Sequence, residues 1–395
     1  MKISLIQPAR NNLKYLQWSY ESIRKNQGDH VVEICVADDF SSDGLAEWCR
    51  KTAEDDENFK WIQNHGPKRL GHTILYDKLI NEVASHDICM IFHADMYLAP
   101  HSLDEIECHL KEKTIVSLTR VEPPWWPNSP EKLIVDFGSE PEAFDSDKFL
   151  AWLKDDHWPN VKDKTTNGIF APWAFYKKDF QEIGGHDPIY APQSKEDSDI
   201  FNRFKLNGLK FIQTWRGCVY HLCCRGSRFN PSLTNPGQDS GEWKKQNKKS
   251  ERNFIRKWGS NVRHNEYLDP IIIPKYKTHF LVKNCSEAFL RELEPYCSTI
   301  SVDCDFDSYI SDEQPRTPFP LKDKISKLSI FDNLNSKEGL VVQVDCMKIN
   351  EEDMFALKNI NEIVLNKNIS GQVSTNSLHI NFNNTTSTEK SLIKI

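Results

Sequence analysis

Short apolar runs alternate with longer amphipathic stretches over the first 120 residues of the chain. The apolar runs have the length and composition of strands, at residues 3–7, 31–37, 59–63, 88–92 and 114–119. The stretches between them have the apolar spacing of helices, at residues 13–25, 44–53, 73–84 and 103–110. Because parallel neighbouring strands are joined by helical crossovers, the pattern predicts an α/β fold with a mainly parallel sheet flanked by helices.

The alternation stops at residues 121–165, which are rich in proline and tryptophan and then in charged residues. We interpret this segment as an insertion or lid. Beyond it the pattern predicts strands at 170–176, 211–214 and 218–222 and helices at 179–183, 197–206 and 253–258. The polar segment 227–249 has few apolar residues and is expected to be mobile.

Leu268-Asp269-Pro270 predicts a boundary between a first domain, residues 1–268, and a second domain, residues 270–395. The second part carries strand patterns at 279–282 and 339–344 and a helix pattern at 287–293. It is therefore expected to be a small α/β domain. Its role is open between acceptor binding, subunit pairing in a homo-oligomer and a second activity.

The net charge of −7 gives the chain no basic field, so neither a nucleic acid nor an anionic membrane is expected as its main partner. The eleven cysteines are odd in number and irregularly spaced, which argues against a secreted disulfide framework. No apolar run has the length of a membrane span. We therefore expect a soluble cytoplasmic protein without an integral membrane segment, whose membrane contacts, if any, are peripheral.

Polar groups follow two of the predicted strands directly. The strand at 88–92 stops at His93 and Asp95, and the strand at 31–37 is followed by Asp38 and Asp39. Ligands of open α/β sheets bind beyond the carboxyl ends of the strands, so these residues are candidates for chemistry. The turn at 41–44 can cap a helix, but capping needs one such residue and does not explain the pair of aspartates.

These strand ends, together with further motifs that follow in the expected order along the chain, resemble the family-2-like nucleotide-sugar glycosyltransferases with the A-type fold. Asp38-Asp39 with the following Ser-Ser-Asp-Gly turn, the strand end at 7–12 and the glycine-containing segment 66–73 are similar to the nucleotide-binding half of that family. His93-Ala94-Asp95 lies where the family has its Asp-x-Asp motif. Histidine in the first position is a departure, which leaves the identity of the metal open.

The resemblance continues over about residues 1–265. Gly184-Gly185, preceded by Trp173, is similar to the acceptor-side glycine pair, and Glu196-Asp197 to the family's Glu-Asp motif at a helix start. His221 lies where A-type enzymes often carry a metal-binding histidine. Residues 253–259 are similar to the closing helix of the catalytic domain.

The resemblance implies an inverting, metal-dependent glycosyltransferase whose catalytic domain has a donor half, about residues 1–120, and an acceptor half, about 121–268. It implies Asp197 as the general base, assisted by Glu196, and a divalent cation, Mn²⁺ or Mg²⁺, on Asp95 and His221. The implied donor-binding residues are Pro8, Arg10, Asn11, Asp38, Asp39, His93, Arg225 and Arg228. The implied acceptor-binding residues are Trp173, Gly184, Gly185, Glu196 and Asp199. The partners would be a nucleotide-sugar donor and a carbohydrate or glycoconjugate acceptor.

Alternatives stay open at this stage. The tryptophans Trp125, Trp126 and Trp173 suit sugar stacking and core packing equally, and the carboxylates at 196 and 199 also favour a helix N-terminus. A sugar nucleotidyltransferase has a related sheet, but residues 8–12 lack the glycines its loop needs. A non-catalytic carbohydrate-binding protein that keeps the fold is the third reading, suggested by His93.

Overall fold

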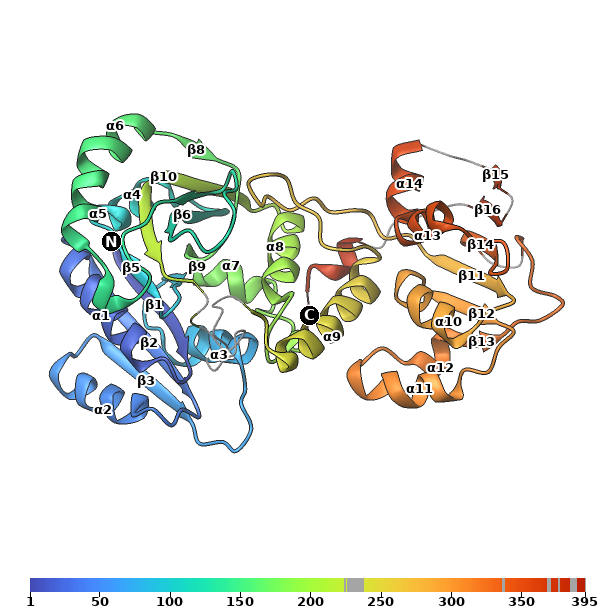
Figure 1. Cartoon of the computed structure of the whole chain (residues 1–395), viewed down its shortest axis with the longest axis horizontal. Helices are drawn as coiled ribbons and strands as arrows, with labels where there is room; N and C mark the ends of the chain where they lie inside the picture. The colour runs from blue at the N-terminus through green and yellow to red at the C-terminus, as the bar shows by residue number, and fades with distance from the viewer. Residues whose placement is uncertain are drawn as a thin grey trace. The chain divides into compact units, whose positions relative to one another are not determined.

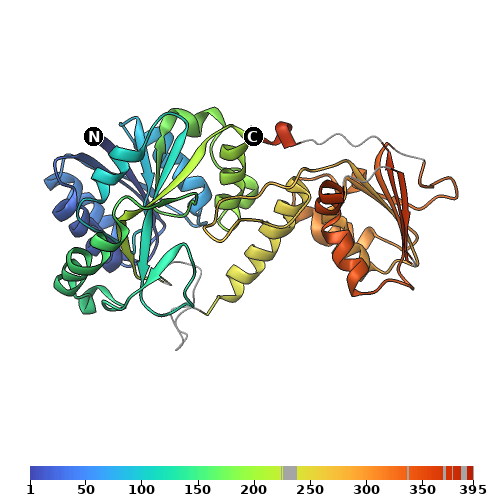
Figure 2. The same cartoon turned by 90° about the horizontal axis from the view of Figure 1, so that it is seen from above.

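The computed structural model describes residues 1–223, 225, 238–335, 338–367, 371–375, 377–383 and 389–394. These fall into two compact units, which are described separately (Figures 1 and 2). The first unit consists mainly of residues 1–246 and 264–270. The second consists of residues 247–263 and 271–393. None of the described helices is both long enough and apolar enough to cross a membrane.

The first unit is built on one large sheet with the strand order β3-β2-β1-β4-β9-β6-β10-β5. Its strands are β1 (Lys2–Ala9), β2 (Val31–Asp39), β3 (Phe59–Asn64), β4 (Ile88–Ile91), β5 (Met96–Leu98), β6 (Thr114–Glu122), β9 (Trp173–Tyr176) and β10 (Lys210–His221). The strands β7 (Lys132–Ile134) and β8 (Thr165–Thr166) pair with β6 and β10. The β1–β2, β2–β3, β1–β4 and β6–β10 pairs are parallel, and β9 and β5 run antiparallel to their neighbours.

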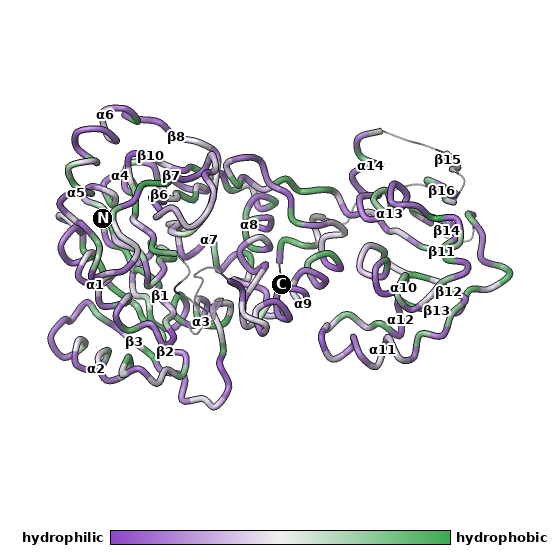
Figure 3. Tube along the Cα trace, viewed as in Figure 1, coloured by the Kyte–Doolittle hydropathy of each residue, from purple (hydrophilic) through white to green (hydrophobic). Residues whose placement is uncertain are grey.

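The central strands are buried on both faces, which explains why they read as unbroken apolar runs. In Figure 3 the hydrophobic colour gathers along the strands. The crossover helices are α1 (Leu13–Asn26), α2 (Leu45–Asp55), α3 (His72–Lys78), which continues as a π-helical turn at Leu79–Val83, and α4 (Ser102–His109). Because crossovers are right-handed, α1 and α2 cover one face of the sheet and α3 the other. The predicted mainly parallel α/β sheet with flanking helices is confirmed.

The insertion folds against the sheet instead of remaining irregular. It contains α5 (Ser146–Trp152) and α6 (Trp158–Val161), and Phe137 and Phe149 pack with Tyr97 and Tyr220 in one buried cluster. Aromatic side chains of this size bury enough apolar area to hold such a segment in place. The insertion is therefore part of the core of the first unit.

Three further helices follow the insertion: α7 (Lys177–Glu182), α8 (Glu196–Leu206) and α9 (Gly241–Trp258). The two strands expected at 211–214 and 218–222 form the single strand β10, which has an irregularity between Thr214 and Cys218. Helix α9 begins well before the predicted residue 253, so residues 241–249 of the segment that was expected to be mobile are helical. Residues 226–237 lie outside the described residues.

The second unit contains a smaller sheet with the order β13-β12-β11-β14-β16-β15. Its strands are β11 (Thr278–Lys283), β12 (Thr299–Val302), β13 (Ile325–Lys327), β14 (Gly339–Asp345), β15 (Gly371–Ser374) and β16 (Leu378–Asn383). Its helices are α10 (Glu287–Leu293), α11 (Asp307–Glu313), α12 (Leu321–Lys324), α13 (Glu351–Lys358) and α14 (Ile360–Lys367). The first four strands are parallel, and a separate apolar core surrounds them. The predicted small α/β fold of this region is confirmed.

Candidate metal centre and active site

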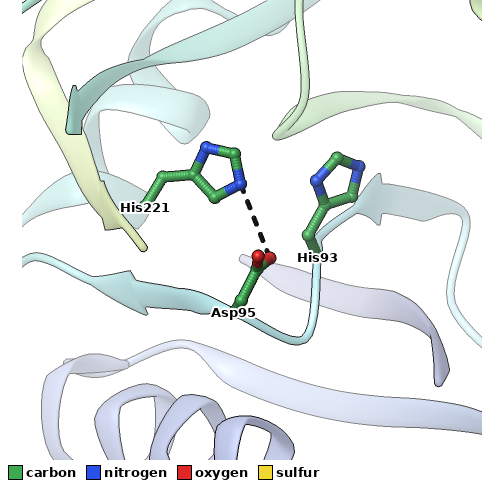
Figure 4. Close-up of side chains that lie close together, drawn as sticks. All are labelled: His93, Asp95 and His221. Carbon is green, nitrogen blue, oxygen red and sulfur yellow. Dashed lines mark ion pairs between the residues drawn. The ribbon is translucent and has the colours of Figure 1, made fainter. Parts of the chain in front are cut away.

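Sheet topology brings His93, Asp95 and His221 together. The chain leaves β4 at Ile91 and passes through His93 and Asp95 into β5, while His221 is the last residue of β10, directly opposite Met96. The Nε2 atom of His221 lies 3.5 Å from Oδ1 of Asp95. One ligand atom from each of the three side chains lies within 4.8 Å of the others, and the side chains face a common point (Figure 4).

Glu122, the last residue of β6, orients His221 from the other side. Its Oε1 atom lies 3.1 Å from Nδ1 of His221, and the carboxylate also pairs with Arg120 at 2.9 Å and Lys132 at 2.8 Å. Glu122 is only 1% exposed, so this network is shielded from solvent. A carboxylate on the far nitrogen is the usual support for a metal-binding histidine because it fixes the tautomer and the ring plane.

The charge states of His93 and Asp95 suit a cation, and His221 becomes a ligand once it releases its proton. Burial lowers the pKa of His93 to about 3, so its ring is neutral and keeps a free lone pair. Burial works to raise the pKa of Asp95, but His221 outweighs it and holds the carboxylate below its usual range. Burial also opposes the charged form of His221, yet Cys223 and Asp95 raise its pKa. The cluster therefore offers one carboxylate and two imidazoles.

A second group of close ligand atoms, Glu122, His221 and Cys223, shares the same histidine. There the carboxylate already carries two cationic partners, Arg120 and Lys132, which would repel a metal ion. Among the described residues, Asp95 forms its ion pair with His221, which is itself a member of the cluster. Of the two groups, the group of His93, Asp95 and His221 therefore fits a divalent ion better. An all-oxygen site would select Mn²⁺ or Mg²⁺ more strongly than this mixture of nitrogen and oxygen donors does.

The cluster lines a cavity of about 420 Å³. Its lining residues are Pro8, Asn12, His72, Tyr76, His93, Ala94, Asp95, Arg120, Glu122, Trp126, Lys132, Phe170, His221, Cys223 and Arg225. The predicted donor residues Pro8, His93 and Arg225 are thereby brought together with the predicted metal ligands. The guanidinium of Arg225 also pairs with Glu140 at 2.6 Å, which ties the insertion to the cavity wall.

The predicted nucleotide-binding aspartates face the protein's own backbone. Asp39 accepts hydrogen bonds from the N–H groups of Leu70 and Gly71 at 2.8 and 2.9 Å, and Asp38 accepts one from Ser41 at 3.0 Å. Both carboxylates are buried. They fix the loops at the carboxyl edge of β2 and β3, and neither lines the cavity described above. Their contact with a nucleotide stays a prediction.

The turn after β1 is held in a similar way. The side chain of Asn11 accepts a hydrogen bond from the N–H of Ser42 at 2.8 Å. The backbone N–H of Asn11 donates to the hydroxyl of Ser41. Arg10 next to it is partly exposed. Arg228 lies outside the described residues. The donor-binding roles of Arg10, Asn11 and Arg228 therefore stay predictions.

Glu196 and Asp197 begin helix α8 with unusual protonation. Burial and the charge of Asp197 raise the pKa of Glu196 to about 8, and burial raises the pKa of Asp197. The Oε2 atom of Glu196 is buried and has no hydrogen-bond partner among the described residues. Burial, then Asp197, Glu196 and Asp95 in that order, raise the pKa of the Tyr76 phenol, which lines the cavity. The two carboxylates of α8 and the metal-side aspartate thus act on one side chain.

The other predicted acceptor residues have buried, structural surroundings. Asp199 has no exposed surface, and its carboxylate lies 2.7 Å from Nε of Arg203, whose guanidinium also donates to the carbonyl of Gly185. Trp173 is fully buried and stacks near Phe175, with ring centroids 4.7 Å apart. These positions favour the structural alternatives for Asp199 and Trp173, and their acceptor contacts stay predictions.

The glycine pair shapes the approach to α8. Gly184 and Gly185 have φ values of 86° and 77°, which side-chain-bearing residues rarely adopt. A Cβ atom on Gly185 would lie 2.1 Å from Oδ2 of Asp77. Asp77 in turn accepts hydrogen bonds from the N–H of His186 and lies 2.7 Å from its Nδ1 atom. The pair therefore serves close packing, and contact with an acceptor stays a prediction.

The sequence reasoning missed Glu122 and Tyr76. Glu122 also ends an apolar strand, so the signal that found Asp95 would have found it, but its strand end was read as the start of the insertion. Tyr76 occupies an apolar position of α3, where nothing in one sequence distinguishes a cavity wall from a core residue.

The fold and site together define an α/β domain with a metal-capable cluster at its strand ends. Residues 4–184 match the model of Glycosyl transferase family 2. Over this segment, which is less than half of the chain, the sequence is similar to glycosyltransferase family 2, in agreement with the resemblance of its motifs. No curated protein matches the sequence.

Three solved structures are similar to part of this chain. GalNAc-T7 with UDP, GalNAc and Mn²⁺ is 14% identical, with 65% of this chain and 48% of that chain covered and a TM-score of 0.45. The mannosyltransferase PcManGT from Pyrobaculum calidifontis with GDP-Man and Mn²⁺ is 15% identical, with coverages of 65% and 61% and a TM-score of 0.40. TarS 1-349 of S. aureus is 16% identical, with coverages of 56% and 60% and a TM-score of 0.40. The chain spans less than two thirds of each of these proteins.

Proposed function

We propose that this protein is an inverting, metal-dependent glycosyltransferase that moves a sugar from a nucleoside-diphosphate donor to a hydroxyl of a carbohydrate or glycoconjugate. One observation carries the proposal: the cavity lined by His93, Asp95 and His221 also contains Tyr76, on which the carboxylates of α8 act. Transfer from a diphosphate requires a metal-capable cluster and a general base, and the proposal takes that base from the carboxylates whose charges reach Tyr76 in the cavity wall.

His93, Asp95 and His221 would hold the divalent ion, which supplies Lewis-acid stabilisation of the charge on the leaving diphosphate. Glu122 keeps the His221 ring in place through its Nδ1 atom. Arg225 at the same cavity offers a guanidinium for phosphate oxygens. We assign the nucleoside to the strand ends at Pro8, Arg10, Asn11, Asp38 and Asp39, as the resemblance implies.

Asp197 is the proposed general base, which removes the proton of the acceptor hydroxyl. A carboxylate with a raised pKa is a better proton acceptor than an ordinary one, provided that it is ionised. Glu196, with a pKa of about 8, is largely protonated at neutral pH and has an unpartnered oxygen with which to hold an acceptor hydroxyl. The indole of Trp126 lines the cavity and offers a face for a sugar ring.

The test is metal-stimulated hydrolysis of a panel of nucleotide sugars, with and without Mn²⁺ or Mg²⁺. Wild-type protein should release nucleoside diphosphate from one donor, and Asp95→Ala should lose the response to added metal. Asp29→Ala, an exposed aspartate between α1 and β2, is the matched control and should retain it. Undiminished release by wild-type protein in excess chelator would rule out the metal dependence.

A non-catalytic carbohydrate-binding protein is the second candidate, supported by the histidine at position 93. It predicts that a nucleotide sugar or glycan raises the melting temperature without being cleaved. Donor cleavage that D197N abolishes would exclude this candidate.

A further inference from the structure

Three cysteines follow three neighbouring parallel strands of the second unit. Cys285 comes two residues after β11, Cys304 two residues after β12, and Cys346 directly after β14. Because β12, β11 and β14 are adjacent and parallel, their carboxyl ends meet at one edge of the sheet. None of these residues belongs to the cavity of the first unit.

This edge is a topological switch point. From β11 the chain builds β12 and β13 on one side, and it then returns to the other side of β11 to form β14. Loops that leave in opposite directions open a crevice at the carboxyl ends of such strands, and ligands of open α/β sheets bind there. Cys285 and Cys346 flank this point, so the fold places thiols where a ligand site is expected.

Hydrogen bonds between the loops hold the three cysteines together. The N–H groups of Asn284 and Cys285 donate to Asp303, at 2.7 and 2.8 Å, and the N–H of Cys346 donates to the carbonyl of Lys283 at 3.0 Å. The side-chain amide of Asn284 donates to Asp345 at 2.8 Å. The loops after all three strands are therefore fixed relative to one another.

The thiols themselves interact. A hydrogen bond with Cys346 raises the pKa of Cys285 and lowers the pKa of Cys346, and Cys285 also interacts with Cys304. Burial and the neighbouring Cys285 raise the pKa of Cys304 to about 11. The Asp303 carboxylate disfavours a thiolate on each of the three. The three thiols thus lie within electrostatic range of one another and of the Asp303 carboxylate.

We propose that Cys285, Cys304 and Cys346 form a binding site for a thiophilic metal ion of the Zn²⁺ type. Thiolates are preferred ligands of such ions, and Asp303 adds negative charge beside them. As the ion binds, each coordinating thiol releases its proton to solvent and a metal–sulfur bond forms, with no change of oxidation state. A cysteine side chain turns about a single bond, which lets the three sulfur atoms face one ion. The proposal is independent of the glycosyltransferase assignment.

The test uses Cd²⁺ as a spectroscopic probe of the full chain, kept reduced with a phosphine that does not bind the metal. Thiolate-to-Cd²⁺ charge transfer should appear in the ultraviolet and saturate at one equivalent, and Zn²⁺ should displace it. Cys285→Ser should abolish the band, and Asp303→Asn should weaken Cd²⁺ binding by about ten-fold or more because it loosens the loop that holds Cys285.

Two controls separate this site from the other thiols. Cys108→Ser removes an exposed cysteine of α4, and Cys223→Ser removes the thiol near His221. Both variants should keep the band, and circular dichroism should show that Cys285→Ser is folded. An absent band, a band that survives Cys285→Ser in the folded protein, or a disulfide among the three cysteines in the reduced protein would each overturn the proposal.

Discussion

Asp197 is the residue whose chemistry is tested most directly. Asp197→Asn keeps the size of the side chain but removes the proton acceptor. Since positioned base catalysis contributes about 10²- to 10⁴-fold, kcat should fall by about that factor while the KM for the donor changes little. Steady-state transfer kinetics measure both constants. Glu182→Gln serves as the control, because it also replaces a carboxylate by a carboxamide but does so at an exposed position of α7. A near-normal kcat in D197N would assign the base to another group.

Glu122 acts through His221 and is a positioning residue. Glu122→Gln should reduce the affinity for Mn²⁺ by about 10- to 100-fold because the His221 ring loses its ionised partner. Metal titration of activity, together with direct Mn²⁺ binding followed by electron paramagnetic resonance, measures the change. If affinity for the metal is unchanged while stability falls, Glu122 has only a structural role.

Glu196 makes stability depend on pH in a defined direction. Its pKa is about 8 in the folded protein against an ordinary 4.5, so the folded state holds a proton that the unfolded state has lost in this interval. The free energy of unfolding should therefore fall as pH rises from about 4.5 to about 8. Urea unfolding at both pH values should show that Glu196→Gln has a smaller decline. An equal decline in the variant would contradict the raised pKa.

At the scale of elements, helix α8 is anchored by a fully buried ion pair. Asp199 and Arg203 have side chains with no exposed surface. Asp199→Ala leaves the guanidinium buried without its carboxylate, which should cost about 3–5 kcal/mol of stability. Thermal melting should show a marked fall. The exposed pair Glu47 and Arg50 on α2, which is spaced i,i+3, is the control, and Glu47→Ala should scarcely move the melting temperature.

Whether a strand can be predicted from the sequence depends on its length and on how far it is buried. The strands β1 and β2 were predictable because both of their faces are buried, which makes their apolar runs continuous. The three-residue strand β5 has too few positions to show a pattern. Strand β10 looked like two strands because Arg216 and Gly217 interrupt its apolar run at the irregularity.

The same limits apply to the candidate site. His93 and Asp95 were found because each follows a buried strand within a few residues. The partnership of His221 with Glu122 depends on the pairing of β10 with β6, which is a long-range property that one sequence does not encode locally. The engagement of Asp38 and Asp39 by backbone N–H groups depends on loop conformations in the same way.

For the whole molecule, the second unit includes residues 247–263 as well as residues 271–393. Ile255 belongs to its core, and Arg256 pairs with Glu294 at 2.6 Å and with Glu313 at 2.7 Å. Residues 1–268 expressed alone would keep Arg256 and Ile255 but lose these partners. This fragment should melt lower than the intact chain and expose apolar surface to a fluorescent dye. Equal melting temperatures would support the boundary predicted at residues 268–270.

Helix α9 contains the passage from one unit to the other, with Gln246 in the first and Asn247 in the second. The side chain of Gln246 donates to the carbonyls of Tyr190 and Ala191 in the first unit, only a few residues before Arg256 meets its carboxylates in the second. A chain that is recombined at residues 268–270 would keep all of α9 but receive a foreign second unit. Arg256 would then lose its partners Glu294 and Glu313. A chimaera that exchanges the second unit would therefore have to take residues 247–263 of α9 and the loop after it along with residues 271–393.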